Sequence, residues 1–363
     1  MGDYMLEQSN ALPKYSRLKE YLKNIIHQGN IKYGEQIYSE NQLAERFNIS
    51  RHTVRQALND LENEGYVRRE QGRGTFCIYQ EKLSNKKVAV LTTYISNYIF
   101  PRVIKGIEEV LSASGYTLIL ANTNNNKIKE ALCLDNLIKQ DIAGLIVEPT
   151  KSAMDNINLQ YFKELQKKNI PYIFLNAYYS ELDPSYIIMD DQKGEYLATK
   201  YLLQLGHRKI AGIFKSDDLQ GLNRQNGFIE GLNEYGINLN PLWIGNYETE
   251  QTTSYPYQFI RSILHKDPRP TAIVCYNDQI ALKVIQAVKD EGLRVPEDIS
   301  IVGYDDSDQA LISDIKLTTI KHPKSEMGRQ AARLIIDMLE KRVEQPRQIY
   351  QPELIIRFSC QNL

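Results

Sequence analysis

The chain has 363 residues, of which 42% are hydrophobic and 25% are charged, and its formal net charge is −1. This length exceeds one compact core of ordinary size, so two or three domains are expected. The composition is that of a globular protein, and the absence of any run of about 18 apolar residues excludes a membrane-spanning chain.

Residues 12–79 predict three helices followed by a β-hairpin. Apolar residues recur at helical spacing in residues 14–28, and Gly29 then provides a helix stop. Ser39 is expected to begin a second helix, because its hydroxyl and Gln42 three residues later can form a capping box.

A third helix is predicted over residues 50–65, with Ser50 as its N-cap. The alternating segments 66–70 and 74–79 then read as the two strands of a hairpin. Two helices joined by a short turn and followed by a β-wing are typical of a winged helix-turn-helix domain. In such a domain the second of the two helices enters the major groove, and its N-terminal residues touch bases.

Cations gather on the first turns of the third predicted helix, as Arg51, His52 and Arg55. The helix dipole adds partial positive charge at the same end. A solvated helix face is an alternative explanation, and for two isolated arginines it would be the better one. The helix cap, the turn spacing and the hairpin together favour DNA binding.

Three stretches of this region resemble the DNA-binding domain of GntR-type repressors: PKYSRLKEYLKNIIHQGNI, YSENQLAERFNISRHTVRQALNDLENEGYV and GRGTF. The resemblance covers nearly all of residues 12–78. The family commonly has Leu-Pro where this chain has Ile37-Tyr38, so Tyr38 is expected to contact DNA in its own way. The DNA-contacting residues predicted from the helix pattern and the resemblance together are Tyr38, Asn41, Arg46, Ser50, Arg51, His52, Thr53, Arg55, Gln71, Gly72, Arg73 and Gly74.

The rhythm of the sequence divides the chain into a DNA-binding domain (1–79), a polar linker (80–87) and an effector-binding and dimerisation domain (88–363). In the last part, continuous apolar strands alternate with helices in two successive sets. This pattern predicts two lobes, each with a parallel sheet covered by helices on both faces. No GxxxxGK[ST] or GxGxxG motif follows a strand, so neither a nucleotide nor another cofactor is expected.

Polar and aromatic residues follow these predicted strands, and ligands of open α/β sheets bind at the carboxyl ends of strands. Carboxylates and amides that hold hydroxyls, together with rings that stack on a sugar, predict a sugar site between the lobes. Considered singly, Asp278 and Asp305 could equally cap the helices that follow them. The candidate residues at strand ends are Tyr94, Phe100, Glu148, Asn176, Asp190, Asp278 and Asp305, with Trp243 nearby.

Residues 87–360 resemble the LacI-type effector-binding domain, which is itself similar to periplasmic sugar-binding proteins. The resemblance is carried by stretches such as YLLQLGHRKIAGI, NRQNGFIEGL and RPTAIVCYNDQIALKVIQAVKDEG. It implies that Arg224 holds sugar hydroxyls and that Asp278 and Asp305 contact the sugar. The family often has an acid near Asn176 that this chain lacks. The expected fold is therefore multidomain, an N-terminal winged helix-turn-helix plus a C-terminal α/β periplasmic-binding-protein-like domain of two parallel-sheet lobes.

A GntR-type domain joined to a LacI-type domain resembles the arabinose repressors of Gram-positive bacteria. This resemblance implies a homodimeric repressor that binds palindromic operator DNA and is released by L-arabinose. The alternative is a sugar-binding receptor or enzyme whose N-terminal helices bind protein and not DNA.

Features of catalysis, metal binding and secretion are missing from the sequence. Paired acids can hydrolyse glycosides, but no histidine joins the predicted cluster, so no catalytic residue is predicted. The four cysteines lie far apart without a CxxC pair, which indicates reduced thiols and neither a metal site nor a disulfide framework. The N-terminus lacks an apolar run after a basic start, so a cytoplasmic protein is expected.

Overall fold

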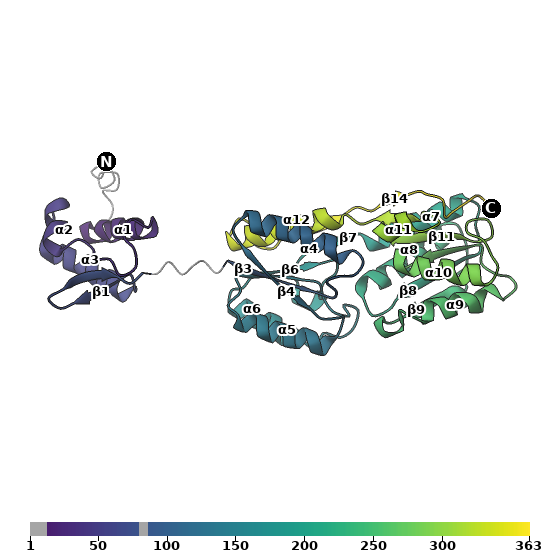
Figure 1. Ribbon diagram of the computed structural model, residues 1–363, viewed down its shortest axis with the longest axis horizontal. Helices are drawn as coiled ribbons and strands as arrows, with labels where there is room; N and C mark the ends of the chain where they lie inside the picture. The colour runs from purple at the N-terminus through teal and green to yellow at the C-terminus, as the bar shows by residue number, and fades with distance from the viewer. Residues whose placement is uncertain (1–12, 80–85) are drawn as a thin grey trace. The chain divides into compact units, whose positions relative to one another are not determined.

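A computed structural model describes residues 13–79 and 86–363 of the chain. The chain divides into two compact units, residues 1–85 and residues 86–363 (Figure 1). Most of the predicted linker, residues 80–85, lies outside the described residues. No helix in the described part of the chain is long and apolar enough to cross a bilayer.

The first unit has the predicted order of elements within residues 13–79. They are α1 (Lys14–His27), α2 (Glu40–Arg46), α3 (Arg51–Asn63), β1 (Val67–Glu70) and β2 (Gly74–Cys77). The two strands pair antiparallel, with Val67 opposite Cys77. The helices pack around a small apolar core of Leu18, Leu22, Ile26, Leu43, Val54, Leu58 and Leu61.

The predicted helix boundaries are present in the first unit. Ser39 and Gln42 form the capping box of α2, and the Ser50 hydroxyl accepts from the Thr53 backbone N–H at 3.1 Å. Gly29 follows α1 with φ of 72°, a left-handed conformation that favours glycine. An N-cap side chain contributes about 1 kcal/mol. Ser50 therefore fixes where α3 begins and hence which side chains occupy its first turn.

The second unit contains two six-stranded sheets within residues 86–363. The amino-terminal lobe holds, in sheet order, β13 (Arg347–Tyr350), β7 (Ser185–Met189), β6 (Tyr172–Leu175), β5 (Gly144–Val147), β3 (Lys87–Thr92) and β4 (Thr117–Asn122). The carboxy-terminal lobe holds β14 (Glu353–Ile355), β12 (Thr318–Lys321), β11 (Ser300–Asp305), β10 (Ala272–Cys275), β8 (Ile210–Lys215) and β9 (Ile244–Tyr247). All neighbouring strands run parallel except β12 and β14, which confirms the predicted parallel-sheet lobes.

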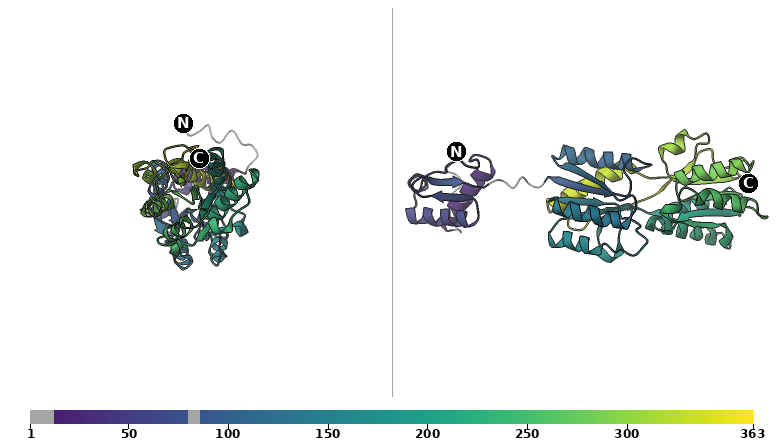
Figure 2. Two further views of the ribbon diagram at one scale, coloured as in Figure 1. Left: turned by 90° about the vertical axis from the view of Figure 1, so that its right-hand side faces the viewer. Right: turned by 60° about the horizontal axis from the view of Figure 1, so that its bottom comes forward.

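Helices cover both faces of each sheet (Figures 1 and 2). In the amino-terminal lobe, α4 (Phe100–Ala113) and α12 (Lys324–Leu339) pack on one face, and α5 (Lys127–Lys139) and α6 (Leu159–Lys167) on the other. In the carboxy-terminal lobe, α7 (Asp191–Gln204) and α8 (Leu219–Glu234) oppose α9 (Tyr255–Leu264) and α10 (Asp278–Asp290). The short helix α11 (Asp308–Ile312) follows β11.

The chain passes between the lobes three times within residues 86–363. The crossings join β7 to α7, β12 to α12, and β13 to β14. Each crossing segment is short, so rotation of a few backbone bonds would tilt one lobe against the other.

Candidate ligand cavity and DNA-binding surface

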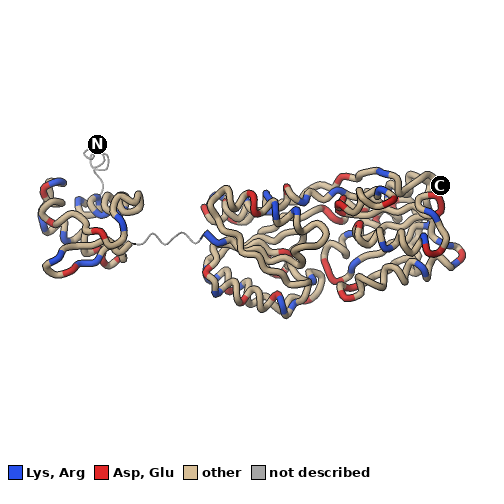
Figure 3. Tube along the Cα trace, viewed as in Figure 1, with Lys and Arg blue, Asp and Glu red and all other residues tan. Residues whose placement is uncertain are grey.

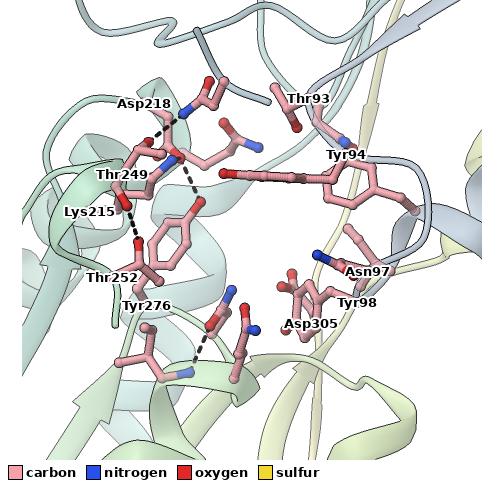
Figure 4. Close-up of a pocket in the computed structure, with 18 of the residues that line it drawn as sticks. Thr93, Tyr94, Asn97, Tyr98, Lys215, Asp218, Thr249, Thr252, Tyr276 and Asp305 are labelled. Carbon is pink, nitrogen blue, oxygen red and sulfur yellow. Dashed lines mark hydrogen bonds and ion pairs between the residues drawn. The ribbon is translucent and has the colours of Figure 1, made fainter. Parts of the chain in front are cut away.

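A cavity of about 370 Å³ lies between the two lobes, at the carboxyl ends of their strands. This volume falls within the range of small-molecule sites. Figure 4 shows Tyr94 projecting from the amino-terminal lobe toward Lys215, Asp218 and Tyr276 of the other lobe. The cavity wall includes these predicted residues: Tyr94, Phe100, Glu148, Asn176, Arg224 and Asp305.

Arg224 forms the charged centre of the carboxy-terminal wall. Its Nη2 lies 2.8 Å from Asp191 Oδ1 and 3.5 Å from Asp305 Oδ1. The guanidinium also stacks over the Tyr304 ring, 3.6 Å from the ring centroid. Burial raises the pKa of Asp191 to about 6, and the neighbouring Arg224 opposes that rise. The guanidinium is thus held between two carboxylates, with its orientation fixed.

A second ion cluster lies on the same wall, and the sequence prediction did not include its two aspartates. Lys215 Nζ lies 3.2 Å from Asp217 Oδ1 and 2.9 Å from Asp218 Oδ2, and the Tyr276 hydroxyl donates to Asp218 at 2.7 Å. Burial opposes the charge on Lys215, but the two aspartates outweigh it and raise the pKa of the ammonium group. Asp218 could have been found from the sequence, because it follows strand β8 just as the predicted acids follow theirs.

The amino-terminal wall is built from hydrogen bonds among Glu148 and neutral groups. Glu148 accepts from the Thr93 backbone N–H at 3.0 Å and from Asn176 Nδ2 at 2.9 Å. His322 Nε2 lies 3.2 Å from Asn176 Oδ1, while its Nδ1 has no partner among the described residues. Burial raises the pKa of Glu148 and lowers that of His322 to about 4, so the imidazole is neutral at neutral pH.

Asp190 and Asp278 were predicted site residues, but both lie outside the cavity wall of the described structure. Asp190 accepts from the Lys193 backbone N–H as the N-cap of α7, so the next residue, Asp191, faces the cavity instead. Asp278 is fully buried, and Asn277 is the N-cap of α10.

Hydrogen bonds account for the position of Asp278. Its carboxylate accepts from the Thr319 hydroxyl at 2.6 Å and from the Ser307 backbone N–H at 2.7 Å. Trp243, expected near the sugar, belongs instead to the apolar core of the carboxy-terminal lobe.

The first turns of α3 present the predicted cations to solvent. Arg51, His52 and Arg55 are all exposed. The hydroxyls of Ser50 and Thr53 lie 2.9 Å apart, so both are used in the helix cap. Arg55 Nε donates to the Glu40 carboxylate at 2.8 Å. Figure 3 shows acidic as well as basic positions in this unit, which limits the positive charge to local groups.

The wing turn, residues 71–74, is exposed throughout. Gly72 and Gly74 have φ of 75° and 122°, conformations that other residues rarely adopt. Gln36 Nε2 donates to the Arg73 carbonyl at 2.9 Å, and Arg69 donates to the Arg55 carbonyl at 3.0 Å. These bonds tie the wing to the rest of the unit and to α3.

The remaining predicted DNA contacts lie on and before α2. Asn41 and Arg46 are exposed, and Tyr38 exposes 41% of its surface. The Arg46 guanidinium lies over the Tyr38 ring, 5.2 Å from its centroid. The departure from the family pattern at Tyr38 therefore places an aromatic ring beside a cation on this surface.

A winged helix-turn-helix unit and a two-lobed unit with a polar interlobe cavity together define a ligand-responsive DNA-binding regulator. Residues 14–77 match the model of bacterial regulatory proteins of the gntR family, and residues 199–360 match that of the periplasmic binding protein-like domain.

Two curated relatives span almost the whole chain, and both are described as an arabinose metabolism transcriptional repressor. The relative from Halalkalibacterium halodurans is 46% identical and covers 95% of this chain and 96% of its own. That from Geobacillus stearothermophilus is 44% identical and covers 98% and 100%. The chain belongs to this family of transcriptional repressors and is not an enzyme.

A solved structure supports the assignment of the second unit. A LacI family transcriptional regulator from Enterococcus faecium with bound ribose superposes with a TM-score of 0.66 at 28% identity, covering 76% of this chain and 99% of its own. The second unit thus has the fold of a LacI-type sensor.

Proposed function

We propose that this repressor binds a palindromic operator as a homodimer and releases it when L-arabinose occupies the interlobe cavity. The observation that carries the proposal is the arrangement of charges in the cavity wall. Arg224 is already matched by Asp191 and Asp305, and Lys215 by Asp217 and Asp218. An uncharged sugar can bind to such paired ions through its hydroxyls without adding a further charge to the buried site.

The two walls of the cavity together offer aromatic and polar contacts to a pentose. Tyr94 and Phe100 lie with ring centroids 5.7 Å apart, and such rings can cover the C–H face of a sugar. Glu148 and Asn176 on the same wall, with Arg224 on the opposite wall, offer acceptors and donors for hydroxyls. We therefore assign the sugar contacts to these residues and to Asp305, with Asp191 in place of Asp190.

For DNA, we assign base reading to the first turns of α3 and groove contact to the wing. Arg51 has an exposed side chain at the start of the helix, where the major groove would meet it. Arg55 has to exchange its bond with Glu40 for a base or a phosphate. The glycines of the wing turn allow close approach to the sugar–phosphate backbone.

A palindromic operator requires two DNA-binding units related by a two-fold axis. Ile128 and Leu132 form an exposed apolar pair one turn apart on α5, beside the edge strand β4. This edge is our candidate for contact with a second copy.

Calorimetric titration of the full-length protein with L-arabinose, D-ribose, D-xylose and D-glucose tests the ligand. We expect saturable binding of L-arabinose and at least about tenfold weaker binding of the others, since one lost hydroxyl contact leaves a buried partner unpaired. Tighter binding of another sugar would reassign the inducer, and binding of none would reject the sugar-sensing proposal.

A further inference from the structure

The end of strand β11 has an unusual backbone. Asp305 and Asp306 adopt φ of 94° and 47°, so two consecutive residues with side chains occupy the left-handed region. Such conformations persist only where the surroundings hold them, and they cluster at ligand and switch sites. The Asp305 carboxylate faces Arg224 in the cavity wall. Whatever holds this backbone therefore also sets the position of a cavity carboxylate.

Two side chains from the amino-terminal lobe hold this strand end. Lys324, the first residue of α12, donates from Nζ to the carbonyls of Asp305 at 2.5 Å and of Asp306 at 2.7 Å. Tyr98, just before α4, donates to the Tyr304 carbonyl at 2.9 Å. Tyr98 itself has φ of 60°, and Figure 4 shows it beside Asp305.

The Tyr98 hydroxyl also accepts from the Asp278 backbone N–H at 3.2 Å, so Tyr98 contacts the start of α10 as well. An ion pair between Arg102 of α4 and Asp308 of α11 adds a third link between the same two regions.

The helices that carry these residues are packed closely enough to move together. A Cβ atom added to Gly106 of α4 would lie 2.3 Å from the Ser325 carbonyl oxygen of α12. A Cβ atom added to Gly328 of α12 would lie 2.2 Å from the Val103 carbonyl oxygen of α4. The two backbones thus touch at a pair of glycines, and displacement of one helix has to displace the other.

We propose that Lys324 and Tyr98 are positioning residues that couple the cavity to the α4–α12 helix pair. They fix the end of β11, and with it Asp305, to this helix pair. A sugar that hydrogen-bonds to Asp305 therefore also shifts the two helices. Helix α4 directly follows β3, the first strand after residues 80–85, which places the response in the part of the sensor that leads to the DNA-binding unit. The ligand in this coupling is the L-arabinose of the proposed function.

Amide hydrogen exchange of the full-length protein tests the positioning without any ligand. Lys324→Met and Tyr98→Phe remove the donors and keep most of the side-chain volume, while Lys105→Met at an exposed position of α4 is the matched control. We expect exchange in residues 304–308 to accelerate at least about fivefold in both variants, as loss of such bonds to buried groups implies. Strand β3 should be unaffected. A wild-type rate in residues 304–308, or equal acceleration everywhere, would overturn the proposal.

The coupling is tested by repeating the exchange with saturating L-arabinose. We expect the wild type and the control to gain protection both in residues 215–224 and in α4, and Lys324→Met and Tyr98→Phe to gain it only in residues 215–224. Full protection of α4 in Lys324→Met would refute the coupling. If calorimetry finds no L-arabinose binding to the wild type, the proposed ligand fails, and the ligand-free exchange still decides whether Lys324 and Tyr98 hold the strand end.

Discussion

The Arg224 guanidinium lies 2.8 Å from the Asp191 carboxylate, and the two side chains expose only 4% and 3% of their surfaces. Taking both ions out of water carries a large desolvation penalty, which their mutual attraction offsets only in part. Loss of either partner leaves the other charged and buried. Loss of this ion pair is therefore expected to affect both the stability of the sensor and ligand binding in its cavity.

Replacing Arg224 with alanine is expected to abolish sugar binding and to leave operator binding intact. The free energy of unfolding should fall by about 3–5 kcal/mol, because Asp191 and Asp305 lose their cation. Calorimetry with L-arabinose and thermal unfolding measure the two effects. Arg294→Ala is the control, since its ion pair with Asp298 is exposed at the arginine end and should contribute less than about 1 kcal/mol. Undiminished sugar affinity in Arg224→Ala would contradict the assigned role.

Replacing Arg51 with alanine is expected to weaken operator binding while sugar binding stays unchanged. A good bidentate contact to a base contributes roughly 1–3 kcal/mol, and a dimer loses it twice. Arg55→Ala should act in the same direction. Fluorescence anisotropy with labelled operator, measured over a range of salt concentrations, gives both the affinity and the salt dependence. Operator affinity equal to that of the wild type would mean that Arg51 does not contact the operator.

The buried carboxyl of Glu195 predicts a pH dependence of stability. Both of its oxygens lack hydrogen-bond partners among the described residues, and burial raises its pKa from 4.5 to about 8, against the opposing effect of Arg224. The carboxyl therefore favours the folded state fully below pH 4.5, and this stability is lost as the pH rises through about 8.

Glu195→Gln should remove that loss, because the amide does not ionise. We expect the variant to be more stable than the wild type at pH 9 by an amount on the order of a few kcal/mol, and to differ far less at pH 5. Urea unfolding at the two pH values measures the difference. A parallel change at both values would mean that Glu195 does not titrate in this range.

Asp278→Ala is expected to affect stability far more than sugar affinity. The substitution leaves the Ser307 N–H and the Thr319 hydroxyl, which now bond to the carboxylate, without an acceptor. Each orphaned group costs about 1–3 kcal/mol. Thermal unfolding together with calorimetry separates the two effects. Loss of sugar binding in a variant that unfolds at the wild-type temperature would mean that Asp278 does contribute to the sugar site.

Features of the structure that depend on neighbouring residues in the sequence could be predicted from the sequence. The caps at Ser39 and Ser50 and the stop at Gly29 could be predicted because each acts within a few residues of itself. The interlobe site followed from the rule that ligands bind at the carboxyl ends of strands. Arg224, in contrast, came from family resemblance alone, since it lies within a helix and not at a strand end.

Details that depend on backbone direction or on distant partners could not be predicted. Asp190 and Asp191 are adjacent, and only the dihedral angles at the start of α7 decide which one faces the cavity. The contact of His322 with Asn176 joins positions 146 residues apart, and no local pattern marks such a pair. The same applies to Lys324, whose bonds to the end of β11 depend on how the chain crosses between the lobes.

The most direct test of the central claim is operator binding by the full-length protein with and without L-arabinose. The DNA is a fragment selected from a random pool by the protein itself, and affinity is measured at fixed salt concentration. The account predicts a palindromic consensus and an operator affinity that falls by roughly 5- to 150-fold when L-arabinose saturates the cavity. An operator affinity that L-arabinose leaves unchanged, while calorimetry shows the sugar bound, would contradict the account.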